Sequence, residues 1–341
     1  MTIRKPMSWK CIAKNDKMQH CTTTLPVEDD LEIFVAKWIP NDPGKICAAL
    51  QIVHGDAEHG GNYIAFAEVL TEAGFAVYAD DHRGFGKTAG SIDKLEYLAE
   101  SNGWFKVVDD LYKVSVMIKG ECPGVPLFML GHSTGSLFSR TYLYRHGREI
   151  DGLILSGTCG NPGIMGLIGL ILGRLMVKFQ NPKKVSMIGY NLTKKRYNEY
   201  FKPNKTPFDW YTRDMDAIKK YMRDPYCGHI FTNQLFLDIL TGLTDLFKKN
   251  NMAKIPRNIP ILLFGGDKDP FAKKGKGIEE VSASYKKLGV KDVTTIIYPD
   301  GRHEMLQEIN RNEVYRDITN WLFSKLNLLP DSVSLAGPGQ R

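Results

Sequence analysis

Three residue types that can together activate a hydroxyl group occur in order along the chain, beginning with a serine between glycines. Ser133 lies in Gly131-His132-Ser133-Thr134-Gly135, between an apolar run over 125–130 and a helical pattern over 133–144. Small flanking residues allow a sharp strand-to-helix turn. Such a turn exposes the hydroxyl at a helix N-terminus, where backbone N–H groups favour a developing oxyanion. The pentapeptide therefore predicts a nucleophilic serine.

A base and an acid follow in the order that this arrangement requires. A serine hydroxyl needs a base to take its proton, and the base needs an acid to orient it. Among eight histidines, His303 is the one that follows the final apolar run, 293–298, and Asp267 and Asp269 follow the run 260–265. We predict His303 as the base. We predict Asp269 as the acid because it lies at the tip of a glycine turn and precedes a proline that fixes the backbone; Asp267 is the local alternative.

An oxyanion hole needs two backbone donors. One comes from the residue after the nucleophile and the other from the loop after an earlier strand. The first donor is predicted to be the N–H of Thr134. The second is predicted to come from the glycine-rich loop 54–61, with the N–H of Asp56 as the candidate.

The elements that must position these residues follow from the alternation of short apolar runs with helical patterns. This alternation is typical of a mostly parallel sheet with helices on both faces, whose ligands bind at the carboxyl ends of the strands. The predicted strands are 31–39, 48–54, 75–80, 126–130, 152–156, 260–265 and 293–298. Helical patterns cover 62–73, 104–119, 133–144 and 309–326.

The alternation breaks over residues 158–255, which predicts an insertion between two parts of one core, 1–157 and 256–328. The most apolar part of the insertion, 163–173, is too short to span a bilayer. It fits either a helix packed over the core or a lid that covers an acyl pocket and makes transient contact with membranes or lipid aggregates. The stretch 329–341, with its prolines and glycines, is predicted to be a disordered tail.

Charge and cysteine content narrow the function classes. The net charge is +7, and residues 158–250 hold 15 Lys and Arg against 7 Asp and Glu, so the excess is concentrated there. That excess fits a solvated surface or attraction to anionic head groups; no nucleic-acid motif accompanies it, so no nucleic-acid partner is predicted. The 6 cysteines lack metal-ligand spacing, and the first residues lack an apolar signal region. We predict reduced thiols, no metal and a cytoplasmic location.

Five motifs in order carry a resemblance to a known family. They are Gly131-His132-Ser133-Thr134-Gly135, His54-Gly55-Asp56-Ala57-Glu58-His59, Asp80-Asp81-His82-Arg83-Gly84-Phe85-Gly86, Gly266-Asp267-Lys268-Asp269-Pro270 and Tyr298-Pro299-Asp300-Gly301-Arg302-His303-Glu304. From about residue 20 to 327 the chain resembles the monoacylglycerol lipase and lysophospholipase branch of the α/β-hydrolases, also described as serine aminopeptidase-like.

The resemblance implies an α/β-hydrolase fold, with a mostly parallel eight-stranded sheet flanked by helices and a helical cap over an apolar tunnel. It implies that Ser133 is the nucleophile, Asp269 the acid and His303 the base, with the amides of Asp56 and Thr134 as the oxyanion hole. No cofactor is implied.

The same resemblance gives supporting roles to three more residues. Glu58, His59 and Arg83 match positions that buttress the loop beneath the cap.

Two residues depart from the family pattern. Asp56 stands where a small or apolar residue is usual, and a carboxylate beside a developing oxyanion opposes it unless the side chain turns away or is paired. Phe85 replaces a histidine, a change of packing rather than of chemistry.

The predicted function is a serine hydrolase that cleaves esters of single-chain lipids, a monoacylglycerol or a lysophospholipid, through an acyl-enzyme. The alternatives are a short-chain carboxylesterase, an aminopeptidase of the same fold, and a non-catalytic lipid-sensing protein. An aminopeptidase should carry an acidic anchor for the substrate amine. The insertion offers Asp209, Asp214, Asp216 and Asp224. The oligomeric state is not predicted.

Overall fold

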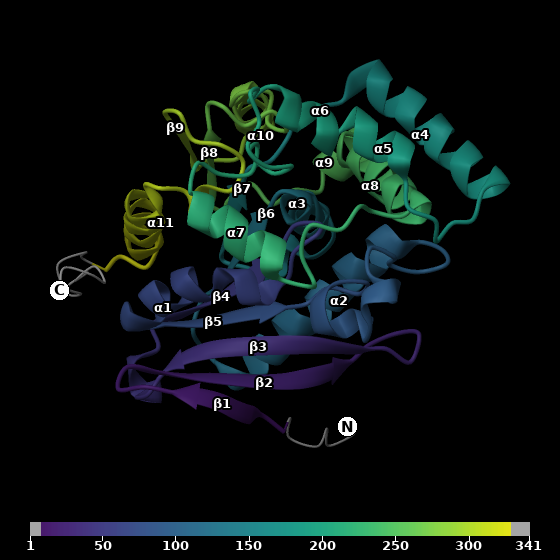
Figure 1. The fold of residues 1–341 in the computed structure, drawn as a ribbon. Coiled ribbons are helices and arrows are strands. Elements are labelled where there is room, and N and C mark those ends of the chain that lie inside the picture. Colours follow the sequence, from purple (N-terminus) through teal and green to yellow (C-terminus); the bar gives the residue numbers. More distant parts are fainter. Residues whose placement is uncertain (1–7, 329–341) are drawn as a thin grey trace.

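A twisted mixed sheet forms the centre of the molecule in the computed structural model, which describes residues 8–328 (Figure 1). Within those residues the sheet has nine strands, in the order β1-β2-β3-β5-β4-β6-β7-β8-β9. Their bounds are β1 Lys10–Lys14, β2 Met18–Pro26, β3 Glu32–Pro40, β4 Ala48–Val53, β5 Phe75–Asp80, β6 Leu127–His132, β7 Gly152–Ser156, β8 Ile261–Gly266 and β9 Val293–Tyr298. Pairing is antiparallel from β1 through β5 and parallel from β5 to β9.

The α/β fold and the mostly parallel sheet are as predicted, but the expected count of eight strands is wrong. One strand that no apolar run marked is β1 at the sheet edge, whose five residues are all exposed. Because β1 buries neither face, its sequence shows no hydrophobic alternation. The backbone ladder with β2 holds it in place.

The register of β1 against β2 also corrects the prediction that all six cysteines are reduced. Cys11 lies directly opposite Cys21 in the ladder, and the two form a disulfide. In the described part of the chain the other four cysteines, Cys47, Cys122, Cys159 and Cys227, are free thiols. The pairing depends on strand register, which the spacing of the cysteines along the chain did not reveal.

Helices cover both faces of the sheet, so the central strands β4, β5, β6 and β8 are buried along their whole length. Residues of α1 (Ile64–Glu72) and α11 (Arg311–Lys325) pack into the core on one face. Residues of α2 (Gly103–Glu121), α3 (Thr134–His146) and α10 (Lys276–Lys287) pack into the core on the other. This double cover explains why these strands are nearly continuous apolar runs.

Residues 158–255, here named the helical segment, join β7 to β8, which are neighbours in the sheet. Its helices are α4 Gly163–Phe179, α5 Met187–Leu192, α6 Lys194–Glu199, α7 Met215–Arg223, α8 Asn233–Leu246 and α9 Lys249–Met252. α4, α5 and α6 gather on the side of the molecule opposite β1 (Figure 1). The division into a core and an insertion at these bounds stays a prediction, and the predicted tail 329–341 lies outside the described residues.

Across residues 8–328, no helix combines the length and the apolar character that a membrane crossing would need.

Candidate active site

Ser133 lies on a sharp turn between the end of β6 and the start of α3. Its backbone has φ 51° and ψ −122°, outside the usual regions for a residue with a side chain. The flanking glycines are required by close backbone approach. A Cβ on Gly131 would lie 2.6 Å from the carbonyl oxygen of Gly135, and a Cβ on Gly135 would overlap the carbonyl oxygens at the end of β4. The turn therefore has the strand-to-helix geometry that the pentapeptide predicted.

The structure brings Ser133, His303 and Asp269 together in one chain of hydrogen bonds. Ser133 Oγ lies 2.8 Å from His303 Nε2, and His303 Nδ1 lies 2.9 Å from Asp269 Oδ2. The three residues come from loops at the carboxyl ends of β6, β9 and β8, where a parallel sheet presents its ligand-binding edge. Asp267, the alternative acid, instead pairs with Lys268 at 3.1 Å. The arrangement can transfer a proton from the serine hydroxyl to the imidazole.

The helical segment covers this site. The ring of Trp210 lies 4.9 Å from that of His303, and the ring of Phe271 lies 5.4 Å from it on another side. The backbone N–H of His303 donates to the carbonyl of Trp210. Ser133 is only 7% exposed as a result. Aromatic rings therefore cover the imidazole of His303, and Ser133 is almost buried.

Asp56 and Thr134, the predicted sources of the oxyanion-hole amides, lie side by side. Thr134 Oγ1 donates to Asp56 Oδ1 at 2.9 Å, and the other carboxylate oxygen of Asp56 lies 2.5 Å from Lys194 Nζ. Burial would raise the pKa of the Asp56 carboxyl, but attraction to the Lys194 ammonium, together with hydrogen bonds from Lys194 and Thr134, lowers that pKa. The Asp56 carboxylate is therefore charged and paired with Lys194. Because the lysine balances its charge, the carboxylate need not oppose an oxyanion that forms beside it.

The three residues predicted to buttress the loops have partners in the structure. Glu58 accepts hydrogen bonds from Gly55 N at 2.5 Å and from a tyrosine hydroxyl, which fixes the loop after β4. His59 Nε2 lies 3.0 Å from Asp224 at the end of α7. The Arg83 guanidinium forms a two-pronged pair with Asp110 of α2, at 2.6 and 3.1 Å. These contacts join the loops beneath the site to α2 and to the helical segment.

Among residues 8–328, two groups of side chains have ligand atoms close enough to hold a metal ion. The first is Glu58, His132 and Glu304, buried beneath the site. Burial would lower the pKa of His132, but the carboxyls of Glu304, 2.8 Å away, and of Glu58 raise it to about 9, which favours an ion pair here. The second is His59 with Asp224 and Cys227, where burial raises the pKa of the thiol and disfavours the thiolate that a metal needs.

The aspartates weighed as anchors for a peptide amine already have partners. One accepts from backbone N–H groups of a turn, and one caps the N-terminus of α7 and pairs with Arg311. The third pairs with Lys219 and the fourth with His59. In chain order these are Asp209, Asp214, Asp216 and Asp224. Asp216 is largely exposed and makes only this surface pair among the residues that the structure describes, whereas the other three carboxylates are held by contacts within the helical segment or with the core.

Sequence reasoning missed Lys194, Trp210 and Glu96, which surround the predicted residues. Lys194 belongs to the run Thr193-Lys194-Lys195-Arg196, in which nothing marks one lysine as buried. Trp210 lies in the helical segment, which has no strand pattern to fix its orientation. The one available signal was Asp56, which departs from the family pattern. A carboxylate beside an oxyanion needs a cation to balance its charge.

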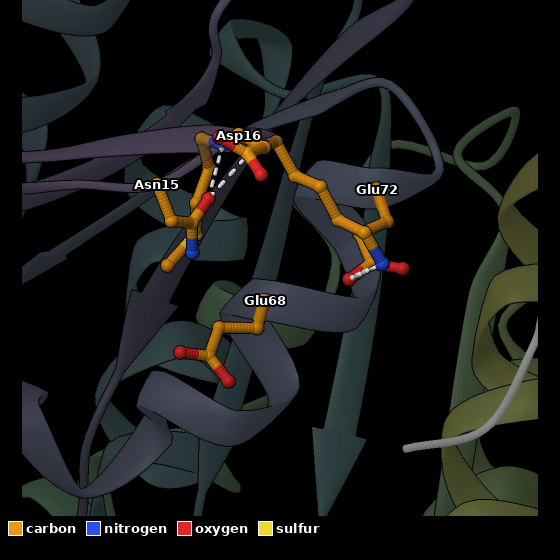
Figure 2. Close-up of a pocket in the computed structure, with 6 residues that line it drawn as sticks. Asn15, Asp16, Glu68 and Glu72 are labelled. Atoms are coloured by element: carbon orange, nitrogen blue, oxygen red, sulfur yellow. Dashed lines mark hydrogen bonds and ion pairs between the residues drawn. The ribbon is translucent and has the colours of Figure 1, made fainter.

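Two hollows on the surface lie away from this site. The one drawn in Figure 2 is lined by Asn15, Asp16, Lys17, Met18, Glu68 and Glu72, with Lys17 paired to Glu72 at 2.9 Å. The second lies over the end of α7, around Lys219 and Arg223. Ser133 lines neither of these two hollows.

Comparisons with known proteins identify a family and several relatives to which this chain is similar. Residues 44–310 match the family described as serine aminopeptidase, S33. A monoacylglycerol lipase of Mycolicibacterium smegmatis is 26% identical over 85% of this chain and 92% of its own length. A monoglyceride lipase homologue of Monkeypox virus is 27% identical over 87% of this chain and 96% of its own. The crystal structure of a highly thermostable carboxyl esterase from Bacillus coagulans, in complex with glycerol, has a TM-score of 0.83 and 26% identity over 90% of this chain and 99% of its own.

Proposed function

Because the chain belongs to the serine aminopeptidase S33 family of α/β-hydrolases, we propose that it is a serine hydrolase that cleaves carboxylic esters of single-chain lipids. The observation that carries the proposal is the continuous hydrogen-bond chain from Ser133 through His303 to Asp269. A monoacylglycerol or a lysophospholipid is the proposed substrate class, in keeping with the lipases and the esterase to which the chain is similar.

In the proposed reaction Ser133 Oγ attacks the ester carbonyl carbon while His303 Nε2 takes the hydroxyl proton. Asp269 accepts the hydrogen bond from His303 Nδ1 and stabilises the imidazolium that forms. The backbone N–H groups of Asp56 and Thr134 bind the oxyanion. His303 then protonates the departing alcohol. Water, activated by the same imidazole, cleaves the acyl-enzyme and releases the fatty acid.

The lipid half of the proposal is supported by the outer face of α4. Seven apolar side chains of α4 are 47 to 75% exposed and form an apolar strip along the helix. They are Ile164, Met165, Leu167, Ile168, Ile171, Leu175 and Phe179. α4 itself lies at the outer edge of the helical segment (Figure 1). A strip of this kind on a helix, near basic residues, suits an interface of lipid and water. We propose that the helical segment acts as a cap that docks on such an interface and admits one acyl chain.

The test is fatty-acid release from a long-chain monoacylglycerol by the wild type and by S133A, with an acyl-length series alongside. Turnover by the wild type that rises with chain length, and none by S133A, is expected. A rate that is highest for acetyl and butyryl esters would contradict the lipid assignment and favour a short-chain carboxylesterase. A fluorophosphonate probe that fails to label the wild type would contradict the role of Ser133 itself.

A further inference from the structure

We infer that Lys194 is a positioning residue of the reaction: its ammonium group neutralises the Asp56 carboxylate, which would otherwise oppose the charge that develops on the substrate oxygen. The inference rests on the proposed function, since it concerns the same oxyanion site. It adds a requirement that the serine, histidine and aspartate do not themselves impose.

The contacts place this ion pair at the oxyanion site. Asp56 contributes a proposed oxyanion donor through its backbone N–H, and its side chain is tied through Oδ1 to Thr134, the other proposed donor. Its second oxygen, Oδ2, lies 2.5 Å from Lys194 Nζ, and the two side chains are 13% and 11% exposed. Lys194 is the first residue of α6, so the cation comes from the helical segment and the anion from the sheet loop.

The low exposure of the pair increases the effect that the charge of Asp56 has on a nearby oxyanion. Solvent is largely excluded around the pair, so a carboxylate without its cation would act on the nearby oxyanion with little screening. At a separation of a few ångströms, such a charge slows an oxyanion-forming step by about 10- to 100-fold. The carboxyls of Glu96 and Glu58 also act on Lys194, but the ion-pair contact of its ammonium group is with Asp56. The positive charge of Lys194 is therefore paired mainly with the carboxylate of Asp56.

A purely structural role for the pair predicts something different. If Lys194 only tied α6 to the loop after β4, removing either partner would loosen the same contact, and removing both would give no recovery. If Lys194 acts through charge, then neutralising Asp56 in a Lys194 variant removes the unpaired anion and restores the rate. The sign of the second substitution's effect separates the two roles.

The experiment is a double-mutant cycle with K194M and D56N, measured as kcat and KM on p-nitrophenyl butyrate and as the rate of Ser133 labelling by a fluorophosphonate. K194M keeps the shape of the side chain and removes its charge. K195M, which removes an exposed charge one residue along α6, is the matched control. Melting temperatures show whether each variant is folded. If K194M does not fold, K194Q takes its place in the cycle.

K194M is expected to lower kcat about 10- to 100-fold with little change in KM, and K195M to leave both unchanged. Adding D56N to K194M is expected to bring kcat back to within about threefold of the wild type, a gain at least tenfold larger than D56N gives alone. A folded K194M with wild-type kcat, or a double variant as slow as K194M, overturns the inference. Failure of the proposed function looks different, since then the wild-type Ser133 neither turns over ester nor reacts with the probe, and both proposals fall.

Discussion

Replacing Glu96 with glutamine should remove part of the fall in folding stability that the wild type shows as the pH rises. Glu96 is 1% exposed, and neither of its carboxyl oxygens finds a hydrogen-bond partner among residues 8–328. Burial raises the pKa of this carboxyl from 4.5 to about 8, and the nearby Lys194 only partly opposes the rise. E96Q keeps the size and the neutral form of the side chain and removes its titration.

The direction and size of the effect follow from proton linkage. In the folded protein Glu96 keeps its proton up to about pH 8, whereas in the unfolded chain it loses the proton near 4.5. Between these values the folded state holds the extra proton, so wild-type stability falls as the pH rises, and it levels off above about 8. At about 1.4 kcal/mol per pH unit, the loss across the window amounts to about 5 kcal/mol. E96Q does not suffer this loss.

Urea unfolding of the wild type and E96Q, followed by tryptophan fluorescence at about pH 5 and about pH 8, measures the difference. The free energy of unfolding of E96Q relative to the wild type should be several kcal/mol higher at the upper pH than at the lower. Any cost of burying the amide is the same at both values and cancels from this comparison. Parallel stability curves for the two proteins would refute the reasoning, because they would mean that Glu96 ionises alike in the folded and unfolded chains.

Three further perturbations have expected outcomes. D269N removes the negative charge that orients His303 and stabilises its imidazolium, and its amide can favour the wrong imidazole tautomer; it should lower kcat by about 10³- to 10⁴-fold without unfolding the protein, as steady-state kinetics and circular dichroism can show. G135A forces a Cβ onto backbone carbonyl oxygens and should lower the free energy of unfolding by at least about 2 kcal/mol in urea titrations; an unchanged midpoint would contradict the tight elbow. I168D, on the apolar strip of α4, should weaken sedimentation with phospholipid vesicles, whereas I92D, a site of similar exposure elsewhere (52% and 50%), should not.

The sequence predicted those parts of the fold in which local pattern and burial agree. The helix that begins after Ser133 was expected over 133–144 and runs over Thr134–His146, and the strand expected at 293–298 is β9. Both belong to a core in which apolar periodicity reports directly on packing. β1 was not predicted because it buries no side chain. The Cys11–Cys21 disulfide was not predicted either, because it depends on the pairing of β1 with β2.

The candidate site divides in the same way. Ser133, His303 and Asp269 follow strands, so their order along the chain determines which edge of the sheet they reach. Lys194 and Trp210 belong to the helical segment, where no strand fixes the direction of a side chain. The positions of these two side chains depend on how the helical segment packs over the sheet. Such tertiary packing cannot be predicted from a local sequence pattern.

The parallel pairing of β7, β8 and β9 has a consequence for the growing chain. Ser133 and His303 are 170 residues apart, and the whole helical segment is translated between the strands that deliver the serine and the acid. Local contacts can form the serine turn early, whereas closing so long a loop is a late and slow event in folding. A ribosome-bound chain that has emerged only through α3 therefore carries a serine with no base to activate it. The order of the strands therefore leaves Ser133 without its base and acid until β8 and β9 have paired. The time at which Ser133 begins to react with a fluorophosphonate probe reports when that final step occurs.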